Sequence, residues 1–253
     1  MLSKEKIIDE LNKLGVPPIE IHFYECADST NTRAKEWAKY SAEKKPAVFI
    51  ANEQTAGRGR RGRSFVSEKG AGIYISILTY PEESGADATA TTARAAVTLA
   101  KATESLSDCD IKIKWVNDLY LGGKKLAGIL TEGEMDKDGK VAYQVVGMGI
   151  NVYKNAISDE ISDIATSIEG VTGRGVDRSK LAAAIIKYHL YYNGDFYTEY
   201  KSRSFIIGKK VTVMKLSESY EAKVVDIDSD FSLIIERDGK QERLFTGEIS
   251  LKI

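Results

Sequence analysis

Residues 111–132 of the chain are IKIKWVNDLYLGGKKLAGILTE, and they predict antiparallel strands joined by a glycine turn. In the first part of this stretch apolar and charged residues alternate, which is the period of a strand with one buried face. Two apolar segments, 119–121 and 126–132, then flank Gly122-Gly123, and paired glycines between two strands are typical of a hairpin. We therefore expect the core to contain a hairpin-built sheet.

The segments on either side extend this pattern to an α+β fold, a mixed and largely antiparallel sheet covered by helices. Further strands are expected at residues 19–25, 47–51, 73–79 and 141–152, and helices at 3–14, 32–40, 87–106 and 179–200. After Gly208 the texture changes to four short alternating segments with no helix between them, at 209–215, 220–227, 231–236 and 241–246. These predict a small C-terminal β-barrel, and the domains are expected to be 1–206 and 207–253.

Charge and composition narrow the classes of function. The 253 residues carry 36 Lys and Arg against 37 Asp and Glu, so the net charge is −1. Proteins that bind nucleic acid or an anionic membrane usually carry a surplus of basic residues. No apolar run approaches the length of a membrane span, the N-terminus lacks a secretory signal, and the two cysteines match no disulfide or zinc pattern. We expect a cytoplasmic protein with a local site for a small anion.

That local site is expected at residues 57–63, GRGRRGR, in a loop of about twenty residues between two core strands. Glycines let backbone N–H groups approach an anion, and arginine offers forked donors suited to phosphate and carboxylate oxygens. A nuclear localisation patch, an RGG-like RNA tail and a solvated loop are alternatives that the residues alone leave open.

Three further groups of residues accompany the arginine loop. Asn117-Asp118 ends a strand that carries Lys114, and Lys125 begins the strand that leads to Gly128. The third group, GMGIN at 147–151, is a lone G-x-G pattern. A ligand-binding role competes here with plain alternatives: a solvated strand face, a turn, or a bulge.

Taken together and in this order, these motifs resemble those of the biotin–protein ligases. The resemblance covers about residues 22–200 and rests on STN at 29–31, EQTAGRGRRGR at 53–63, KWVNDLY at 114–120, KKLAGILTE at 124–132 and GMGINV at 147–152, with GEISL at 247–251 near the C-terminus. It implies a class II aminoacyl-tRNA-synthetase-like catalytic domain in residues 1–206 and an SH3-like barrel in residues 207–253.

The resemblance implies an ATP-dependent, AMP-forming biotin–[biotin carboxyl carrier protein] ligase. Biotin and ATP would be its substrates and Mg²⁺ its activator, without a tightly bound prosthetic group. The partner would be the carrier domain of a biotin-dependent carboxylase such as acetyl-CoA carboxylase. The metal ligands stay unknown, with Mg²⁺ expected on the nucleotide phosphates. The single N-terminal helix predicts a monofunctional enzyme without a DNA-binding domain, and the resemblance also allows a homodimer.

Site residues carried over from the resemblance fall into three sets. The catalytic set is Lys125, Arg60, Asp118 and Lys114. The biotin-binding set is Ser29, Thr30, Asn31, Gln54, Arg58, Gly59, Arg60, Lys125 and Gly128. The set for ATP and the adenylate is Arg58, Arg60, Arg61, Arg63, Phe65, Asn117, Lys125, Gly149 and Asn151.

This sequence departs from the family pattern at two positions. Val116 stands where the family usually has proline, and Phe65 stands where a tryptophan commonly follows the arginine loop. A lipoate–protein ligase is the nearest alternative, but the triple glycine and the His-Asp pair of that family do not occur here. A nucleic-acid-binding module is the alternative from another class, and the charge balance disfavours it.

Overall fold

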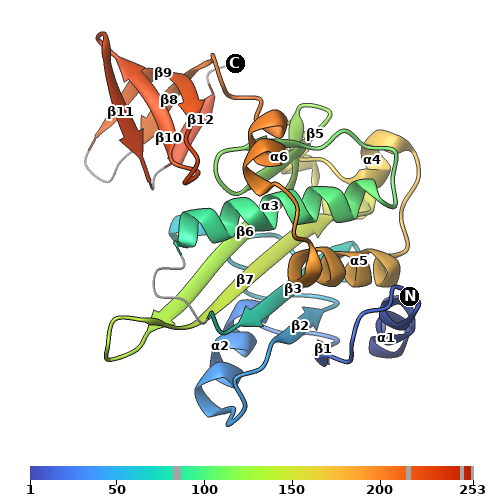
Figure 1. The fold of residues 1–253 in the computed structure, drawn as a ribbon. Coiled ribbons are helices and arrows are strands. Elements are labelled where there is room, and N and C mark those ends of the chain that lie inside the picture. Colours follow the sequence, from blue (N-terminus) through green and yellow to red (C-terminus); the bar gives the residue numbers. More distant parts are fainter. Residues whose placement is uncertain (82–86, 215–217, 246–247, 252–253) are drawn as a thin grey trace.

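The computed structural model describes residues 1–81, 87–214, 218–245 and 248–251, and these form two β-sheets with helices around the larger one (Figure 1). The larger sheet has seven strands in the order β1-β2-β3-β7-β6-β5-β4. Its strands are β1 Glu20–Tyr24, β2 Ala47–Ala51, β3 Gly72–Thr79, β4 Lys112–Lys114, β5 Asp118–Leu121, β6 Lys124–Met135 and β7 Val141–Asn151. Only β1 and β2 pair in parallel, so the prediction of a mixed, largely antiparallel sheet is confirmed.

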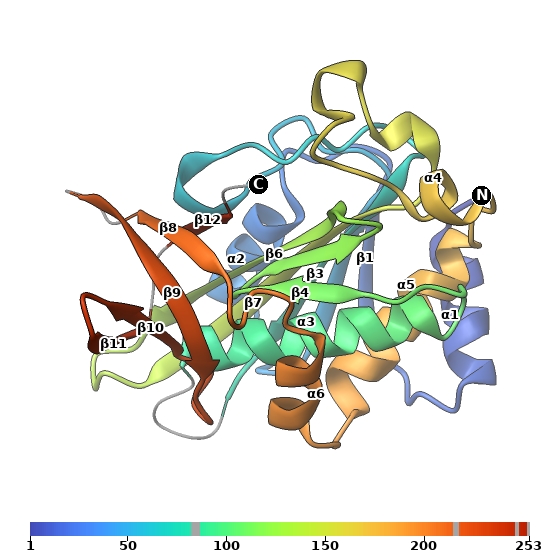
Figure 2. The same cartoon turned by 90° about the horizontal axis from the view of Figure 1, so that it is seen from above.

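Helices cover both faces of this sheet. They are α1 Lys4–Lys13, α2 Thr30–Tyr40, α3 Ala88–Glu104, α4 Ile168–Thr172, α5 Arg178–Tyr191 and α6 Phe196–Arg203. Short 3₁₀ turns lie at η1 Arg60–Gly62, η2 Lys154–Ala156 and η3 Asp159–Ile161. Figures 1 and 2 show α3 and α5 side by side on one face, and α2 packs on the opposite face through Ala34 against Phe49 and Leu78. None of the helices in the described ranges combines the length and apolarity needed to cross a lipid bilayer.

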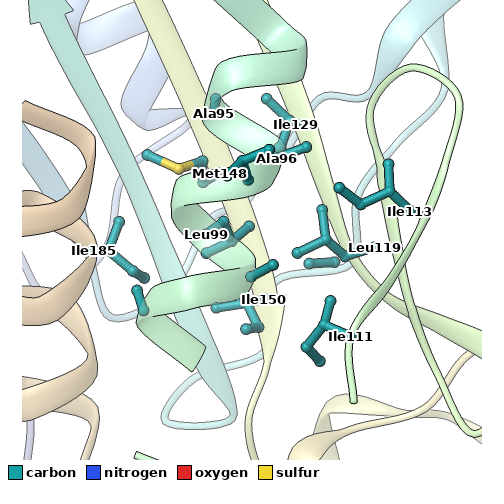
Figure 3. Close-up of a cluster of buried hydrophobic side chains, with 14 of the residues drawn as sticks. Ala95, Ala96, Leu99, Ile111, Ile113, Leu119, Ile129, Met148, Ile150 and Ile185 are labelled. Carbon is teal, nitrogen blue, oxygen red and sulfur yellow. The ribbon is translucent and has the colours of Figure 1, made fainter. Parts of the chain in front are cut away.

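The main core lies between the sheet and α3. Ala95, Ala96 and Leu99 of α3 face Ile129, Met148 and Ile150 of the central strands, with the β4–β5 side chains closing one side (Figure 3). Because strand side chains alternate between faces, the intervening residues of β3, β6 and β7 point to the α2 side. Four of the positions around the pocket carry small residues, Ser76, Gly128, Gly147 and Gly149, which leave room for it.

One predicted helix is wrong. The segment expected as a single helix at 179–200 is two helices, because α5 ends at Tyr191 and α6 begins at Phe196. Asn193 and Gly194 are poor helix formers, and the Asp195 carboxylate accepts from the backbone N–H of Thr198 and caps a new start. The helical spacing of apolar residues continues across residues 192–195, so the sequence did not indicate that the helix ends there.

Two smaller differences concern the first helices. α2 begins at Thr30, two residues earlier than expected, and its N-cap residue Ser29 makes no capping hydrogen bond with its side chain. In α1 only Ile7 and Leu11 of the predicted apolar stripe are buried, because this helix touches the body of the protein along a narrower line than the stripe suggests.

The C-terminal sheet is antiparallel with the order β11-β10-β9-β8-β12, one strand more than predicted. Its strands are β8 Lys210–Met214, β9 Ser219–Ile227, β10 Leu233–Arg237, β11 Lys240–Leu244 and β12 Glu248–Leu251. Positive φ angles at Asp238 and Gly239 form the predicted tight turn. Among the described residues β11 and β12 stay at opposite edges, so the sheet is consistent with an SH3-like domain but does not close into the expected barrel. Gly247 of the GEISL motif lies outside the described residues.

Candidate active site

A pocket lies on the α2 side of the large sheet, where the arginine loop crosses over β6 and β7. Most of the residues that the sequence singled out line this pocket, although they come from segments more than a hundred positions apart. They are Ser29, Thr30, Asn31, Gln54, Arg58, Gly59, Arg60, Arg63, Phe65, Lys114, Asn117, Asp118, Lys125, Gly128 and Gly149.

One end of the pocket is a buried polar cluster at the start of α2. Gln54 Oε1 accepts from the backbone N–H of Thr30 at 2.8 Å and from its hydroxyl at 3.2 Å. The hydroxyl of Ser76, on β3, lies 2.7 Å from Thr30 Oγ1 and 2.6 Å from Asn31 Oδ1. Thr30 and Asn31 are each 3% exposed. Fixed donors and acceptors in a buried pocket suit a small polar ligand group.

The other end carries the charged residues of the β4–β5–β6 hairpins. Lys125 Nζ lies 2.7 Å from Asp118 Oδ1, and the Asn117 side-chain amide donates to the same oxygen at 3.1 Å. Asn117 also accepts from Arg60 Nη1 at 3.0 Å. This contact ties the arginine loop to the hairpin, and Arg60 and Lys125 both line the pocket at the end that carries Asn117 and Asp118.

The arginine loop has a defined shape in this structure. Phe65 N–H donates to Gly57 O at 2.9 Å and Gly59 N–H donates to Arg63 O at 2.6 Å, which folds the loop back on itself. Arg61 has a φ of 54°, in the left-handed region that favours glycine. This turn directs the side chains on either side of it into the pocket, and Arg61 itself is directed away.

The glycines of the pocket floor make room for the protein's own side chains. A Cβ at Gly149 would lie 2.5 Å from Phe65 Cε1, and one at Gly147 would lie 2.1 Å from Asn31 Oδ1. At Gly128 the nearest atoms, of Lys125, would be an ordinary 3.5 Å away. Phe65 therefore occupies the space beside Gly149 that the sequence assigned to a ligand.

Two predicted residues are not brought to the pocket. The Arg61 guanidinium donates to Met214 O at 3.2 Å on the C-terminal sheet. Asn151 is buried, and its side-chain amide donates to Thr166 O at 3.1 Å. Asn151 is the last residue of β7, where the strand packs against a loop. The GMGIN pattern alone does not distinguish this position from one that faces a ligand.

Sequence reasoning missed Gly147 and Met214 among the residues that line the pocket, and it missed Ser76 and Glu132, which hydrogen-bond to lining residues. A polar signal existed for Ser76, which lies within the predicted strand 73–79, and for Glu132, which is the last residue of the predicted segment 126–132. Glu132 Oε2 accepts from Arg58 at 2.7 Å. Burial opposes ionisation of Glu132, but hydrogen bonds from Lys35 and Asn31 and the charge of Arg58 outweigh it and lower its pKa.

A protein-built metal centre is not evident in the part of the chain that the structure describes. No group of three or more His, Cys, Asp and Glu side chains there is arranged to hold a metal ion. Asp118, whose carboxylate lines the pocket, is paired with Lys125.

Comparison with known proteins identifies the class to which this fold and site belong. Residues 23–151 match the Biotin/lipoate A/B protein ligase family. The bifunctional ligase/repressor BirA of Bacillus subtilis is 30% identical over 243 residues, which cover 90% of this chain and 73% of that protein. The chain therefore belongs to the biotin/lipoate A/B protein ligase family, and it is a ligase.

Its particular relatives within that family are biotin ligases. The biotin–[acetyl-CoA-carboxylase] ligase of Mycobacterium tuberculosis is 26% identical over 98% of this chain and 95% of its own length. The structure of biotin protein ligase from Aquifex aeolicus in complex with biotin and ATP superposes with a TM-score of 0.74 and 26% identity, covering 92% of this chain and 98% of that one.

Proposed function

We propose that this chain is a biotin–protein ligase that activates biotin with ATP and transfers it to a lysine of a carboxylase carrier domain. In the first half-reaction a biotin carboxylate oxygen attacks the α-phosphorus of ATP and pyrophosphate leaves. In the second, the carrier lysine amine attacks the acyl carbon of biotinyl-5′-AMP and AMP leaves. The supporting observation is that cationic side chains, among them Arg58, Arg60 and Lys125, line one pocket whose other end is the Thr30–Gln54 cluster.

The cations reduce the electrostatic repulsion between the biotin carboxylate and the ATP phosphates in the first step. Two like charges 4 Å apart repel by about 4 kcal/mol at an effective dielectric constant of 20. Preorganised guanidinium and ammonium groups offset this repulsion between carboxylate and phosphate, and they stabilise the charge that develops at phosphorus. Lys125 and Arg60 take this role because both line the pocket, and each contacts one member of the Asn117–Asp118 pair.

Asp118 serves the second step. Its carboxylate lies 2.7 Å from Lys125 and lines the pocket. A carboxylate beside the acyl carbon attracts the carrier lysine and accepts a proton as the amine attacks. Mg²⁺, which neutralises the pyrophosphate, is best held by the nucleotide phosphates, since the described residues offer it no ligand cluster.

The polar end of the pocket takes the ureido ring of biotin in this proposal. Thr30, Gln54 and Ser29 supply hydroxyl and amide groups, whereas the ring carries N–H donors and a carbonyl acceptor. A site built for hydrogen bonds rejects ligands that lack them, which favours biotin over lipoate, whose dithiolane ring has none.

Incubation of the purified chain with MgATP and radiolabelled biotin, or with labelled lipoate, tests the proposal. Biotinyl-AMP, followed by label on an added apo carrier domain, is the expected product. Formation of lipoyl-AMP in place of biotinyl-AMP would show that the substrate assignment is wrong. No adenylate of either kind, with salt-sensitive binding to DNA or RNA, would favour the nucleic-acid alternative.

Three further properties stay predictions of the sequence. A homodimer is tested by light scattering after size-exclusion chromatography, with and without biotin and ATP. The lack of DNA binding is tested by titrating labelled duplex DNA at low salt. The cytoplasmic location is tested by fractionation of the source cells.

A further inference from the structure

Glu132 is a carboxylate that the proposed chemistry does not use, yet it contacts three parts of the site. It follows the pocket-lining segment of β6, and its side chain is 22% exposed. Oε1 accepts from Lys35 Nζ of α2 at 2.7 Å. Oε2 accepts from the Asn31 side-chain amide at 2.8 Å and from Arg58 Nη2 at 2.7 Å. One carboxylate thus joins α2, β6 and the arginine loop.

The contact with Arg58 leaves that guanidinium able to bind a ligand. A guanidinium has five N–H donors, and among the described contacts Arg58 directs one nitrogen, Nη2, to Glu132. Lys35 and Arg58 together carry two positive charges against one negative, so the cluster keeps a surplus positive charge. Glu132 can therefore orient Arg58 without cancelling its attraction for an oxyanion.

The contact with Asn31 has a different consequence. The Asn31 amide nitrogen donates to Glu132 and to Leu130 O at 3.2 Å, which uses both of its N–H groups. Its oxygen accepts from Ser76 at 2.6 Å. Asn31, which the sequence assigned to the ligand, is thus a fixed connector between Ser76 and Glu132.

These bonds form a continuous chain under the pocket. It runs from Gln54 through Thr30, Ser76 and Asn31 to Glu132, and it ends on Arg58. Gln54 and Arg58 are four positions apart in the segment that contains the arginine loop. The hydrogen bonds therefore connect two points of this segment through residues of α2 and the sheet. The part of this network from Thr30 to Asn31 is buried, and a buried network holds its members in one arrangement when every donor is satisfied, whereas the Arg58 side chain at its end is 40% exposed.

We propose that Glu132 is a positioning residue of the ligase, which holds Arg58 over the pocket and links it to the polar end through Asn31. The role assigned to Arg58, binding biotinyl and adenylate oxygens, rests on the proposed function. The tether itself does not, because it exists between protein groups alone. Lys35 pairs with Oε1, the carboxylate oxygen that Arg58 and Asn31 do not use.

Glu134 provides a matched control for substitutions of Glu132. It lies two residues further along the same strand, and its carboxylate accepts from the Tyr143 hydroxyl at 2.8 Å instead of from the loop. Glu132→Gln and Glu134→Gln remove the same charge from the same strand. Only the first replaces the carboxylate to which Arg58 donates by a neutral amide, which is a weaker acceptor.

Amide hydrogen exchange of the ligand-free protein tests the tether. We expect exchange at residues 57–65 to rise about tenfold in Glu132→Gln and to stay at the wild-type rate in Glu134→Gln, with the core strands of both unchanged. A further rise of less than twofold is expected when Glu132→Gln is added to Arg58→Met, because the contact is already gone. Equal exchange in Glu132→Gln and wild type, or full additivity with Arg58→Met, would overturn the proposal.

Turnover with biotin and MgATP tests the catalytic consequence in the same variants. We expect biotinyl-AMP to dissociate about tenfold faster from Glu132→Gln than from Glu134→Gln, and Arg58→Met to abolish that difference. A wild-type chain that makes no biotinyl-AMP would refute the proposed function, while the exchange experiment would still decide the tether. A wild-type chain that makes it, with Glu132→Gln retaining it as well as Glu134→Gln, would refute the positioning role alone.

Discussion

Lys125 Nζ and Asp118 Oδ1 are 2.7 Å apart across the hairpin of β5 and β6. A register shift between Leu119 and Tyr120 sets this geometry, since Asp118 then pairs with Gly128 while Tyr120 pairs with Lys125. The cation proposed for adenylation and the carboxylate proposed for transfer are therefore neighbours before any ligand is considered. Each limits the freedom of the other.

Loss of the Lys125 ammonium is expected to affect the first half-reaction. Lys125→Met should slow biotinyl-AMP formation by about 10²–10³-fold, the cost of removing one preorganised group that stabilises developing charge. Rapid-quench measurement of the adenylate checks this. Lys124→Met is the control, because Lys124 donates to Ser162 O on the exposed side of the strand and should leave the rate unchanged.

Asp118→Asn is expected to separate the two half-reactions. Loss of a base that accepts a proton from the carrier lysine should slow transfer by about 10²–10⁴-fold, with a smaller effect on adenylation. Single-turnover transfer from preformed biotinyl-AMP measures the second step by itself. Asp110→Asn, which breaks only the exposed pair with Lys112, should match wild type. Equal slowing of both steps by Asp118→Asn would contradict the assignment.

Arg60→Gly is expected to release activated biotin. A hydrogen bond from a charged group contributes about 1.5–3 kcal/mol, so escape of biotinyl-AMP should accelerate by about tenfold to a hundredfold. The measurement is biotin label on lysines of an unrelated bystander protein. Arg61→Gly, at a φ of 54° where glycine is unstrained, removes an arginine that does not line the pocket and should not raise bystander labelling.

Gly149→Ala is expected to displace the Phe65 ring. The new methyl group would lie 2.5 Å from Phe65 Cε1, and overpacking of this kind costs about 1–3 kcal/mol of stability. Gly128→Ala meets only ordinary contacts of 3.5 Å and longer, so its melting temperature should change less. Phe65→Leu should restore part of the stability lost in Gly149→Ala. Thermal unfolding of the four proteins checks this ordering.

The stability of the fold is expected to fall between pH 7 and pH 5, partly through His189. Burial lowers the pKa of His189 in α5 to about 4, whereas an unfolded chain binds the proton near 6.5. The unfolded state therefore takes up more protons in this window and gains stability relative to the folded state as the pH falls. Burial lowers the pKa of His22 in the same direction.

Urea denaturation at pH 7 and pH 5 measures this dependence. The loss of unfolding free energy should be smaller in His189→Gln than in wild type, and His22→Gln reports the separate contribution of the other histidine. An identical pH dependence in wild type and His189→Gln would show that His189 does not contribute.

Local sequence determined most of the secondary structure and the membership of the pocket. Alternation in residues 111–116 predicted a strand that the structure has only at Lys112–Lys114, because the chain turns at 115–117, and the glycine pair at 122–123 predicted the hairpin of β5 and β6. The arginine loop was recognisable because four arginines and three glycines in seven positions are unusual for a segment that only connects two strands. Motifs of this kind carry their chemistry in adjacent residues, so they can be recognised without the fold.

The tertiary structure decided which side chains of the site contact each other. The sequence does not give the partners of Glu132 and Glu134, two carboxylates on the same strand, yet in the fold Glu132 accepts from Arg58 and Glu134 accepts from Tyr143. Likewise Gly149 takes its role from the Phe65 ring, 84 positions away in the chain. The break at residues 192–195 and the fifth strand of the C-terminal sheet also depend on packing. Contacts between distant segments depend on the register and crossing of whole elements, and local propensity carries no information about either.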